Sequence, residues 1–215
     1  MMENLNIIKG LYAITPEEKD SFVLSSQVES CIKGGARLVQ YRSKKLSQIE
    51  KNKQAREIKK VCDYYKVPLI INDDIELCRI LDADGVHLGE DDDSLEEANL
   101  VLGPSKIIGI SCYNSIDRVQ SAVDKGATYI ALGACFPTTT KPNAPSASSD
   151  LITFVLKEFK IPLVAIGGIN LKNIELLINI GVNCFALINS LFKVKDIEGT
   201  AREFSSLIKK RNYER

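Results

Sequence analysis

The stretch GARLVQYRSK, residues 35–44, contains the unit that decides the fold: a glycine after a helical segment, followed by the β-rich run Arg37–Tyr41. Glycine is favoured just past the end of a helix, where the backbone often turns left-handed. A continuous apolar run is typical of a strand that is buried on both faces. The same unit recurs at Gly85, Gly126 and Gly181. The repeat predicts parallel strands that alternate with helices.

Eight runs of this kind predict eight strands. They are Leu11–Thr15, Arg37–Tyr41, Leu69–Asn72, Gly85–Leu88, Ile107–Ser111, Tyr129–Gly133, Leu163–Ile166 and Cys184–Ile188. The 215 residues leave about 27 for each strand and its helix, which suffices for a (β/α)8 TIM barrel, an α/β fold, at the short end of its range. We expect one barrel domain over residues 1–215. A doubly wound open sheet is the alternative, but the G-x-G-x-x-G pattern expected after its first strand is missing.

Polar residues before the helical segments predict where those helices begin. Ser47 and Ser94 are each followed three residues later by a glutamate, the spacing of a capping box. Asn114, Asp150 and Asn170 are predicted to be N-caps, because short polar side chains accept hydrogen bonds from the first helical turn.

The composition excludes several classes of protein. The 28 Lys and Arg residues balance 28 Asp and Glu, so the chain has no broad positive field for nucleic acid or an anionic membrane. Its apolar runs are far shorter than the roughly 18 residues of a membrane span. The first ten residues lack the charged-then-apolar pattern of a signal peptide. We expect a cytoplasmic protein with no nucleic-acid or membrane partner.

The six cysteines and the one histidine are interpreted as structural residues. No two cysteines have zinc-site or C-x-x-C spacing, so we expect buried reduced thiols. Cys112 and Cys135 fall near strand ends, but no histidine neighbours them in sequence. His87 lies between two apolar residues and is interpreted as a packing residue of the barrel rather than a base.

Candidate binding residues gather where the predicted strands end, which is where barrels build their active sites. Gln40, Arg42 and Lys44 alternate along the end of the second strand, and a period of two would place them on one side. Arginine binds phosphate by paired hydrogen bonds and lysine binds it as a point charge. The pattern indicates a polyphosphate site, although a solvated basic strand end would look the same.

Acidic residues follow the next two strands. The third ends in Asn72-Asp73-Asp74, and the fourth is followed by Glu90-Asp91-Asp92-Asp93. Carboxylates from adjacent strand ends can share Mg²⁺, which is commonly held by one or two carboxylates together with substrate phosphates. The alternative is that acids simply favour the helix N-termini that both segments precede.

Two later segments suggest phosphate binding. The segment Phe136–Ser149 has neither helical nor strand periodicity, and such long loops in compact domains usually bind or cover ligands. It carries two hydroxyls and a cation at Thr138, Thr140 and Lys141. The glycine pair that ends the seventh strand precedes the place where barrels frequently bind phosphate. A phosphorylated small molecule is therefore the expected substrate.

The motifs of the thiamine-phosphate synthase family are similar, in order, to LYAITP, VQYRSK, IINDD, DADGVHLGEDD, IIGIS, YIALGACFPTTTK, VAIGGI and CFALINSLF. The resemblance runs from about residue 11 to about residue 192. It implies a (β/α)8 transferase of thiamine biosynthesis that joins 4-amino-2-methyl-5-hydroxymethylpyrimidine diphosphate to a thiazole phosphate. The products would be thiamine phosphate and pyrophosphate, with Mg²⁺ as cofactor.

The resemblance also implies roles for residues at matching positions. The pyrimidine diphosphate would be held by Gln40, Arg42, Lys44 and Asn72, pyrophosphate oxygens by Ser111 and Lys141, and the metal by Asp73 and Asp92. Thr138 and Thr140 would contact the thiazole phosphate, and Gly168, Ile188 and Asn189 match phosphate-binding loops. Arg42, Lys44, Ser111 and Lys141 would be the catalytic residues.

Three positions depart from the family pattern. Glu90 stands where glutamine is usual, Tyr113 where histidine is usual, and Asn189 where serine is usual. Glu90 leaves open whether Asp91 or Asp92 is the metal ligand. One alternative function is a thiazole tautomerase-like isomerase, which uses a histidine near the position of Tyr113. The other alternative function is a barrel that binds thiamine precursors without turning them over. The sequence does not decide the oligomeric state, and a homo-oligomer is possible.

Overall fold

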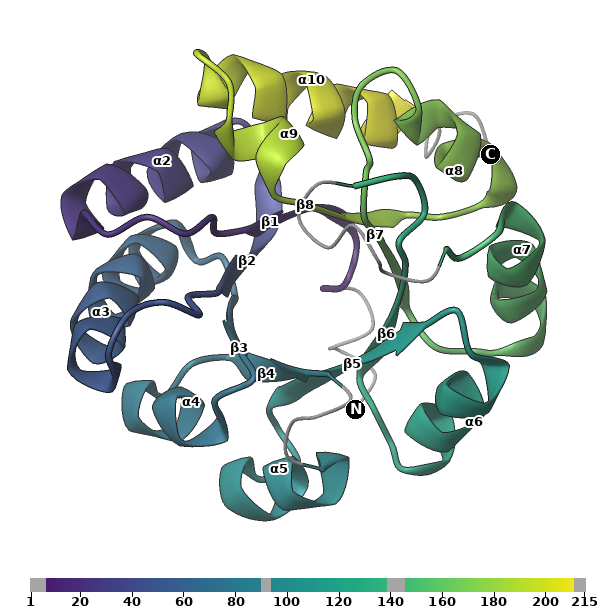
Figure 1. The fold of residues 1–215 in the computed structure, drawn as a ribbon, viewed down its shortest axis with the longest axis horizontal. Coiled ribbons are helices and arrows are strands. Elements are labelled where there is room, and N and C mark those ends of the chain that lie inside the picture. The colour runs from purple at the N-terminus through teal and green to yellow at the C-terminus, as the bar shows by residue number, and fades with distance from the viewer. Residues whose placement is uncertain (1–6, 90–93, 139–145, 211–215) are drawn as a thin grey trace.

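A closed barrel of eight parallel strands, hydrogen-bonded in sequence order from β1 to β8, forms the centre of the molecule (Figure 1). The computed structural model describes residues 7–89, 94–138 and 146–210. The strands are β1 Gly10–Ile14, β2 Ala36–Tyr41, β3 Leu69–Asn72, β4 Gly85–Leu88, β5 Ile107–Tyr113, β6 Tyr129–Leu132, β7 Leu163–Ile166 and β8 Cys184–Leu187. Because β1 pairs with both β2 and β8, the predicted barrel is confirmed and the open-sheet alternative is wrong.

Helices surround the barrel on its outer face (Figure 1). They are α2 Ser21–Lys33, α3 Gln48–Tyr65, α4 Ile75–Leu81, α5 Leu95–Leu102, α6 Ile116–Asp124, α7 Ser149–Glu158, α8 Ile174–Ile180, α9 Asn189–Phe192 and α10 Ile197–Lys210. Ser47 forms the predicted capping box with Glu50, and Ser94 accepts a hydrogen bond from the backbone of Glu97.

Three predicted N-caps are wrong by one to three residues. The residues that precede the helices are Ser115, Ser148 and Asn173 instead of Asn114, Asp150 and Asn170. Ser115 and Ser148 cap because each hydroxyl accepts from the backbone N–H three residues later. Asn170 instead accepts from the backbone of Lys172 in a tight turn before α8 begins. Neighbouring polar residues could all serve as caps, so sequence pattern alone did not separate them.

Successive residues along a strand belong alternately to two apolar cores. Leu11 and Ala13 of β1 belong to the core between the barrel and its helices. Tyr12 and Ile14 of the same strand belong to a separate core inside the barrel. This alternation follows from the period of two along a strand. Inward-facing residues therefore form the floor on which any ligand pocket at the end of the barrel must rest.

Gly109 on β5 leaves room inside the barrel for a large ring. Its register partners are His87 on β4 and Tyr129 on β6. A Cβ at Gly109 would lie 2.0 Å from Cζ of Tyr129 and 2.4 Å from its hydroxyl oxygen. The ring of Tyr129 thus occupies the space that a side chain at position 109 would take.

Gly109→Ala is expected to lower the free energy of unfolding by about 1–3 kcal/mol, because overpacking forces a buried side chain or the backbone to shift. Urea denaturation would measure the change. Ser121→Ala, at an exposed position on α6, is the control and should change stability by less than about 0.5 kcal/mol. Equal stability of Gly109→Ala and wild type would contradict the packing inferred for Tyr129.

Candidate active site

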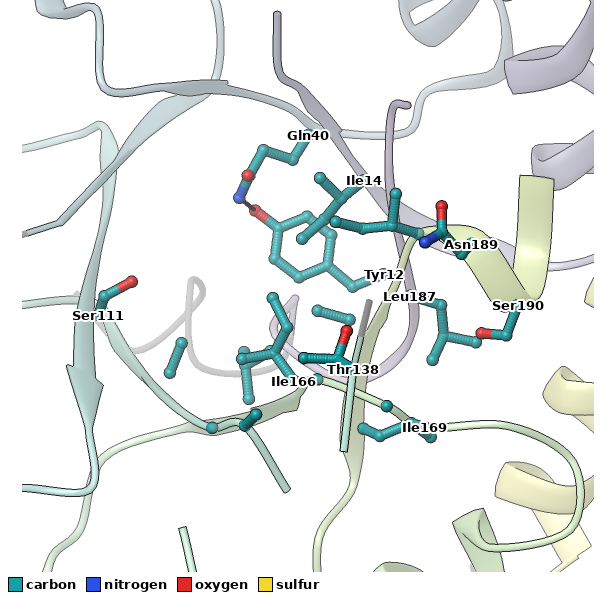
Figure 2. A pocket seen from close by; sticks show the side chains of 18 of the residues that line it. Tyr12, Ile14, Gln40, Ser111, Thr138, Ile166, Ile169, Leu187, Asn189 and Ser190 are labelled. Atoms are coloured by element: carbon teal, nitrogen blue, oxygen red, sulfur yellow. Dashed lines mark hydrogen bonds between the residues drawn. The ribbon is translucent and has the colours of Figure 1, made fainter. Parts of the chain in front are cut away.

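A pocket of about 330 Å³ opens at the carboxyl ends of the strands (Figure 2). Each of the eight strands contributes at least one residue to its lining, and several of the segments that follow the strands contribute others. Eight of the predicted site residues line it: Gln40, Arg42, Asn72, Ser111, Thr138, Gly168, Ile188 and Asn189. The structure thus brings together residues that are up to 149 positions apart in the sequence.

The other predicted site residues do not line the pocket or cannot be placed. Lys44 and Asp73 are not among its lining residues, although each follows a strand whose end contributes one. Asp92, Thr140 and Lys141 lie outside the described residues. The expected alternation of Gln40, Arg42 and Lys44 does not extend to Lys44, because β2 ends at Tyr41 and the strand period ends with it.

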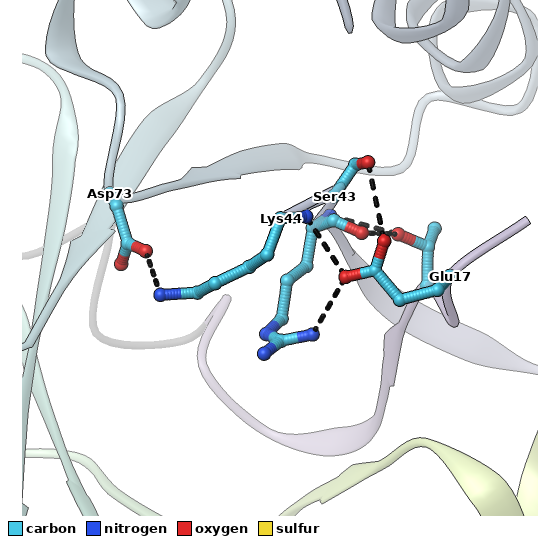
Figure 3. A network of polar contacts seen from close by, with 6 residues as sticks. Glu17, Ser43, Lys44 and Asp73 are labelled. Carbon is cyan, nitrogen blue, oxygen red and sulfur yellow. Dashed lines mark hydrogen bonds and ion pairs between the residues drawn. The ribbon is translucent and has the colours of Figure 1, made fainter. Parts of the chain in front are cut away.

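Glu17, which the sequence did not single out, organises the turn after β2 (Figure 3). Its Oε1 accepts from the backbone N–H of Lys44 at 2.9 Å and lies 3.4 Å from Nη1 of Arg42. The buried hydroxyl of Thr15 accepts from the Arg42 backbone N–H at 2.8 Å. These contacts fix the turn that carries both cations. In the sequence, Thr15 only ends the predicted first strand and Glu17 only follows it.

Lys44 and Asp73 form an ion pair between the ends of β2 and β3. The ammonium Nζ lies 2.8 Å from Oδ2 of Asp73, and the two side chains are 51% and 26% exposed (Figure 3). An exposed pair of this kind contributes at most about 1 kcal/mol. Both groups can therefore be redirected at small cost toward a diphosphate or a cation.

The segments after β6 and β7 are held together by backbone contacts. The N–H of Phe136 donates to the carbonyl of Gly167 at 3.0 Å. Gly168 has a φ of +67°, and a Cβ there would lie 2.5 Å from the carbonyl oxygens of Phe136 and Pro137. Only glycine at position 168 allows the backbone of Phe136 and Pro137 to come this close. This close contact brings Thr138 beside the end of β7 in the pocket wall.

The end of β8 leads directly into the short helix α9. Ile188 precedes the helix and lines the pocket. Asn189 is the first residue of the helix and also lines the pocket (Figure 2). A short extra helix after the last strands frequently binds phosphate in (β/α)8 barrels. The predicted places of Ile188 and Asn189 at this end of the barrel are consistent with that arrangement.

A chain of four hydrogen bonds crosses the inner wall of the pocket. Nε2 of Gln40 donates to the hydroxyl of Tyr12 at 3.0 Å, and that hydroxyl lies 2.9 Å from the hydroxyl of Tyr129. The Tyr129 hydroxyl and Oγ of Ser111 each lie 2.9 Å from a ring nitrogen of His87, Nδ1 and Nε2 respectively. We call these five residues the interior chain.

The sequence did not predict the interior chain. His87 is a packing residue as interpreted, since its ring stacks on Tyr129 with centroids 5.5 Å apart, but both of its nitrogens are also hydrogen-bonded to pocket residues. Tyr12 and Tyr129 belong to strands on different sides of the barrel. No local pattern shows which inward-facing residues of distant strands will meet.

Tyr113 lies in the pocket wall at an irregular end of β5. The strand register shifts between Ser111 and Tyr113, and Tyr113 has a φ of +53°. The guanidinium of Arg118 lies 5.3 Å from its ring and donates to the carbonyl of Ser111. This pair holds the end of β5 in the position that presents Ser111 to the pocket.

All six cysteines are free thiols, as expected, and five of them are buried. Burial raises the pKa of Cys112 to about 12 and that of the half-buried Cys135 to about 11, from an ordinary value of 9.0. Thiols with raised pKa values stay protonated at neutral pH. Neither residue is suited to be a nucleophile.

We expect iodoacetamide to modify Cys135 in the native protein about 100-fold more slowly than a free thiol, because its thiolate fraction falls by that factor. Mass spectrometry after timed alkylation at neutral pH would measure the rate. In urea-unfolded protein, the control, all six cysteines should react. Rapid modification of Cys135 in the native state would contradict the prediction.

The described residues contain no group of three or more His, Cys, Asp or Glu side chains that could hold a metal by themselves. Asp73 supplies one carboxylate at the end of β3, and Mg²⁺ commonly needs only one or two together with substrate phosphates. The donor set therefore fits a metal that binds with its substrate. Among the described helices, none has the length and apolar character needed to cross a membrane.

A pocket at the carboxyl ends of eight parallel strands, with polar residues contributed by several of them, places the chain in the class of (β/α)8-barrel enzymes. The family described as thiamine monophosphate synthase matches residues 11–191. The chain therefore belongs to the thiamine monophosphate synthase family, as its motifs indicated.

Individual relatives agree with this assignment. The thiamine-phosphate synthase of Methylobacillus flagellatus is 47% identical over 201 residues, which cover 93% of this chain and 95% of that protein. The thiamine-phosphate synthase of Nitrosospira multiformis is 46% identical over 206 residues, or 96% and 88% of the two chains. The solved structure of a thiamine phosphate pyrophosphorylase from Pyrococcus furiosus is 29% identical, with a TM-score of 0.85 over 95% of this chain and 97% of that chain.

Proposed function

We propose that this chain joins 4-amino-2-methyl-5-hydroxymethylpyrimidine diphosphate to a thiazole phosphate, giving thiamine phosphate and pyrophosphate with Mg²⁺ as cofactor. The observation that carries the proposal is the pocket itself. It contains the amide of Gln40 and the hydroxyl of Ser111 inside the barrel, and the guanidinium of Arg42 after β2. It also contains Gly168 and Asn189, which follow the last two strands, where barrels of this fold frequently bind phosphate. Such a pocket suits a polar ring that carries a diphosphate next to a second phosphorylated ring.

In the reaction, the bond between the pyrimidine methylene carbon and the diphosphate oxygen breaks, and the electron pair leaves with pyrophosphate. The thiazole nitrogen donates its electron pair to the same carbon. Charge develops on the leaving group, so the barrier falls when fixed cations neutralise it. Arg42, which lines the pocket, is proposed to take this role, and Lys44 would join it by leaving Asp73. Lys141 and Ser111 are proposed to bind the same oxygens.

The two rings also have to be held in line. Gln40 and Asn72 are proposed to hold the pyrimidine side, and Thr138, Thr140, Gly168, Ile188 and Asn189 the thiazole phosphate side. Six of these seven line the described pocket from opposite ends of the barrel sequence, which would set the two rings facing each other: Gln40, Asn72, Thr138, Gly168, Ile188 and Asn189. Holding two reactants in reactive geometry removes much of the entropy cost of their meeting.

Asp73 and Asp92 are the residues proposed to hold Mg²⁺. When bound, the ion would neutralise oxygens of the diphosphate as a Lewis acid. Asp73 is already placed by a backbone hydrogen bond from its N–H to the carbonyl of His87 at 2.9 Å. Its pairing with Lys44 keeps the proposed metal ligand beside a cation that is proposed to bind the diphosphate.

The direct test is incubation of the purified chain with both substrates and Mg²⁺, with thiamine phosphate detected by conversion to fluorescent thiochrome. We expect product only when both substrates are present. Isomerisation of a thiazole phosphate without condensation would support the tautomerase-like alternative, and tight binding without any product would support the non-catalytic barrel. The relatives do not favour either alternative. The cytoplasmic location, and whether the chain forms a homo-oligomer, stay predictions.

A further inference from the structure

The interior chain, Gln40–Tyr12–Tyr129–His87–Ser111, is built almost entirely from buried groups. Gln40, Tyr12, Tyr129 and His87 are 2%, 1%, 0% and 8% exposed, and all five members line the pocket. Figure 2 shows three of them, Gln40, Tyr12 and Ser111. Its two ends, an amide and a hydroxyl, are the members that the proposed function assigns to substrate. The three middle residues have no assigned role.

Each hydroxyl in the middle of the chain carries one hydrogen. Burial raises the pKa of Tyr12 and of Tyr129 well above the ordinary value of a phenol, so both stay protonated. A buried hydroxyl whose hydrogen has no acceptor is destabilising, because it loses its hydrogen bond to water without a replacement. Among the described residues, the hydroxyls of Tyr12 and Tyr129 have hydrogen-bond partners within the chain, and we assign each of their hydrogens to a neighbour there.

Only two arrangements of the hydrogens satisfy this condition along the whole chain. If Tyr12 donates to Tyr129, then Tyr129 donates to Nδ1 of His87, which leaves Nε2 to carry the ring hydrogen and donate to Ser111. If Tyr129 donates to Tyr12, every link reverses. Ser111 then donates to Nε2 of His87, and Tyr12 donates to an acceptor on residue 40.

The amide of Gln40 decides between the two arrangements. Its Nε2 is a donor without acceptor capacity, and it lies 3.0 Å from the Tyr12 hydroxyl. Tyr12 must then accept from Gln40 and pass its own hydrogen to Tyr129. We propose that Tyr12, Tyr129 and His87 are positioning residues that fix the direction in which each hydrogen bond of the chain is donated, from Gln40 toward Ser111. This direction, the polarity of the chain, leaves the hydroxyl hydrogen of Ser111 free to be donated into the pocket.

The consequence concerns the substrate atom that Ser111 meets. Because Ser111 accepts from His87, its hydroxyl is a donor for a phosphate oxygen or a ring nitrogen of the ligand. The reversed chain would make the same hydroxyl an acceptor and leave such an atom without a partner. This role for Ser111 rests on the proposed function, whereas the polarity of the chain can be measured without substrate.

His87 is the only histidine in the sequence, so one residue gives all the imidazole signals. Untagged protein labelled with ¹⁵N-histidine would be examined by long-range ¹H–¹⁵N correlation spectra at neutral pH. We expect Nε2 protonated and Nδ1 unprotonated in the wild type. Protonation of Nδ1 alone, or of both nitrogens, would overturn the proposal. A protein with the expected tautomer but no thiamine phosphate formation would leave the polarity standing and reject the proposed function.

Gln40→Glu tests whether residue 40 sets the polarity. A carboxylate can only accept from Tyr12, so the hydrogen should move from Nε2 to Nδ1 of His87. Gln120→Glu, the same change at an exposed position on α6, is the control and should leave Nε2 protonated. An unchanged tautomer in Gln40→Glu, or a ring protonated at both nitrogens, would overturn the assignment of Gln40 as the residue that decides.

A double-mutant cycle tests whether the middle of the chain acts through Ser111. Tyr129→Phe is expected to lower kcat/KM about tenfold in the wild type, since one hydrogen bond is lost, and less than about twofold in the Ser111→Ala background. Tyr41→Phe removes the same atom from a buried tyrosine that donates to Gln54 outside the pocket, and should change kcat/KM less than about twofold. Equal losses from Tyr129→Phe in both backgrounds would mean a merely structural role and overturn the proposal.

Discussion

Arg42→Ala is expected to lower kcat by about 100-fold or more while changing KM much less, because the guanidinium is proposed to bind the departing pyrophosphate most strongly in the transition state. The structure supports this role, since the Arg42 side chain lines the pocket and is only 18% exposed. Steady-state rates of thiamine phosphate formation over a range of pyrimidine diphosphate concentrations would separate kcat from KM. The same result is expected of Lys141→Ala from the sequence.

Two comparison variants sharpen this test. Arg79 is paired with Glu76 on the outer helix α4 and is 54% exposed, so Arg79→Ala should leave both constants unchanged. Arg42→Lys keeps the charge but loses the paired donors, and an intermediate kcat is expected. A rise in KM with unchanged kcat for Arg42→Ala would show that the residue binds substrate and transition state equally.

The barrel could be predicted from the sequence because its signals are local. All eight strands lie within two residues of their expected bounds, since each is a buried apolar run bounded by helix ends and turns. The end of β5 is the largest departure. It continues to Tyr113 because the register shift after Ser111 lets the strand pair with β6 again. Such irregular pairing depends on the neighbouring strand and leaves no local sequence pattern.

The site was predictable only in part, for the same reason. Polar residues at strand ends, such as Arg42 and Asn72, follow from the rule that barrels assemble their sites there. The interior chain depends on which residues face each other across the barrel. Tyr12 and Tyr129 are 117 positions apart in the sequence. Gly109 makes room for the ring of Tyr129, but a glycine by itself does not indicate in the sequence which side chain will pack against it. Contacts of this kind follow from the closed shape of the sheet.

Removal of divalent metal with excess chelator is expected to abolish thiamine phosphate formation, and added Mg²⁺ should restore it. Asp73→Asn should then raise the Mg²⁺ concentration for half-maximal rate by at least about tenfold, since losing even an outer-shell partner of a metal ligand costs about 10–100-fold. Asp73 has a φ of +65°, a conformation that asparagine also adopts readily, so the variant removes the charge without straining the backbone. The measurement is rate against Mg²⁺ concentration.

Lys44→Met separates loss of a metal ligand from loss of the ion pair. It breaks the 2.8 Å contact between Lys44 and Asp73 but leaves the carboxylate in place. The rate should fall, because a cation that is proposed to bind the diphosphate is gone, while the Mg²⁺ concentration for half-maximal rate should not rise. If both variants raised the Mg²⁺ requirement equally, Asp73 would act through its pairing with Lys44 rather than through the metal. Full activity in excess chelator would contradict the metal requirement itself, since neutralisation of the leaving group would then depend on Arg42 and the lysines alone.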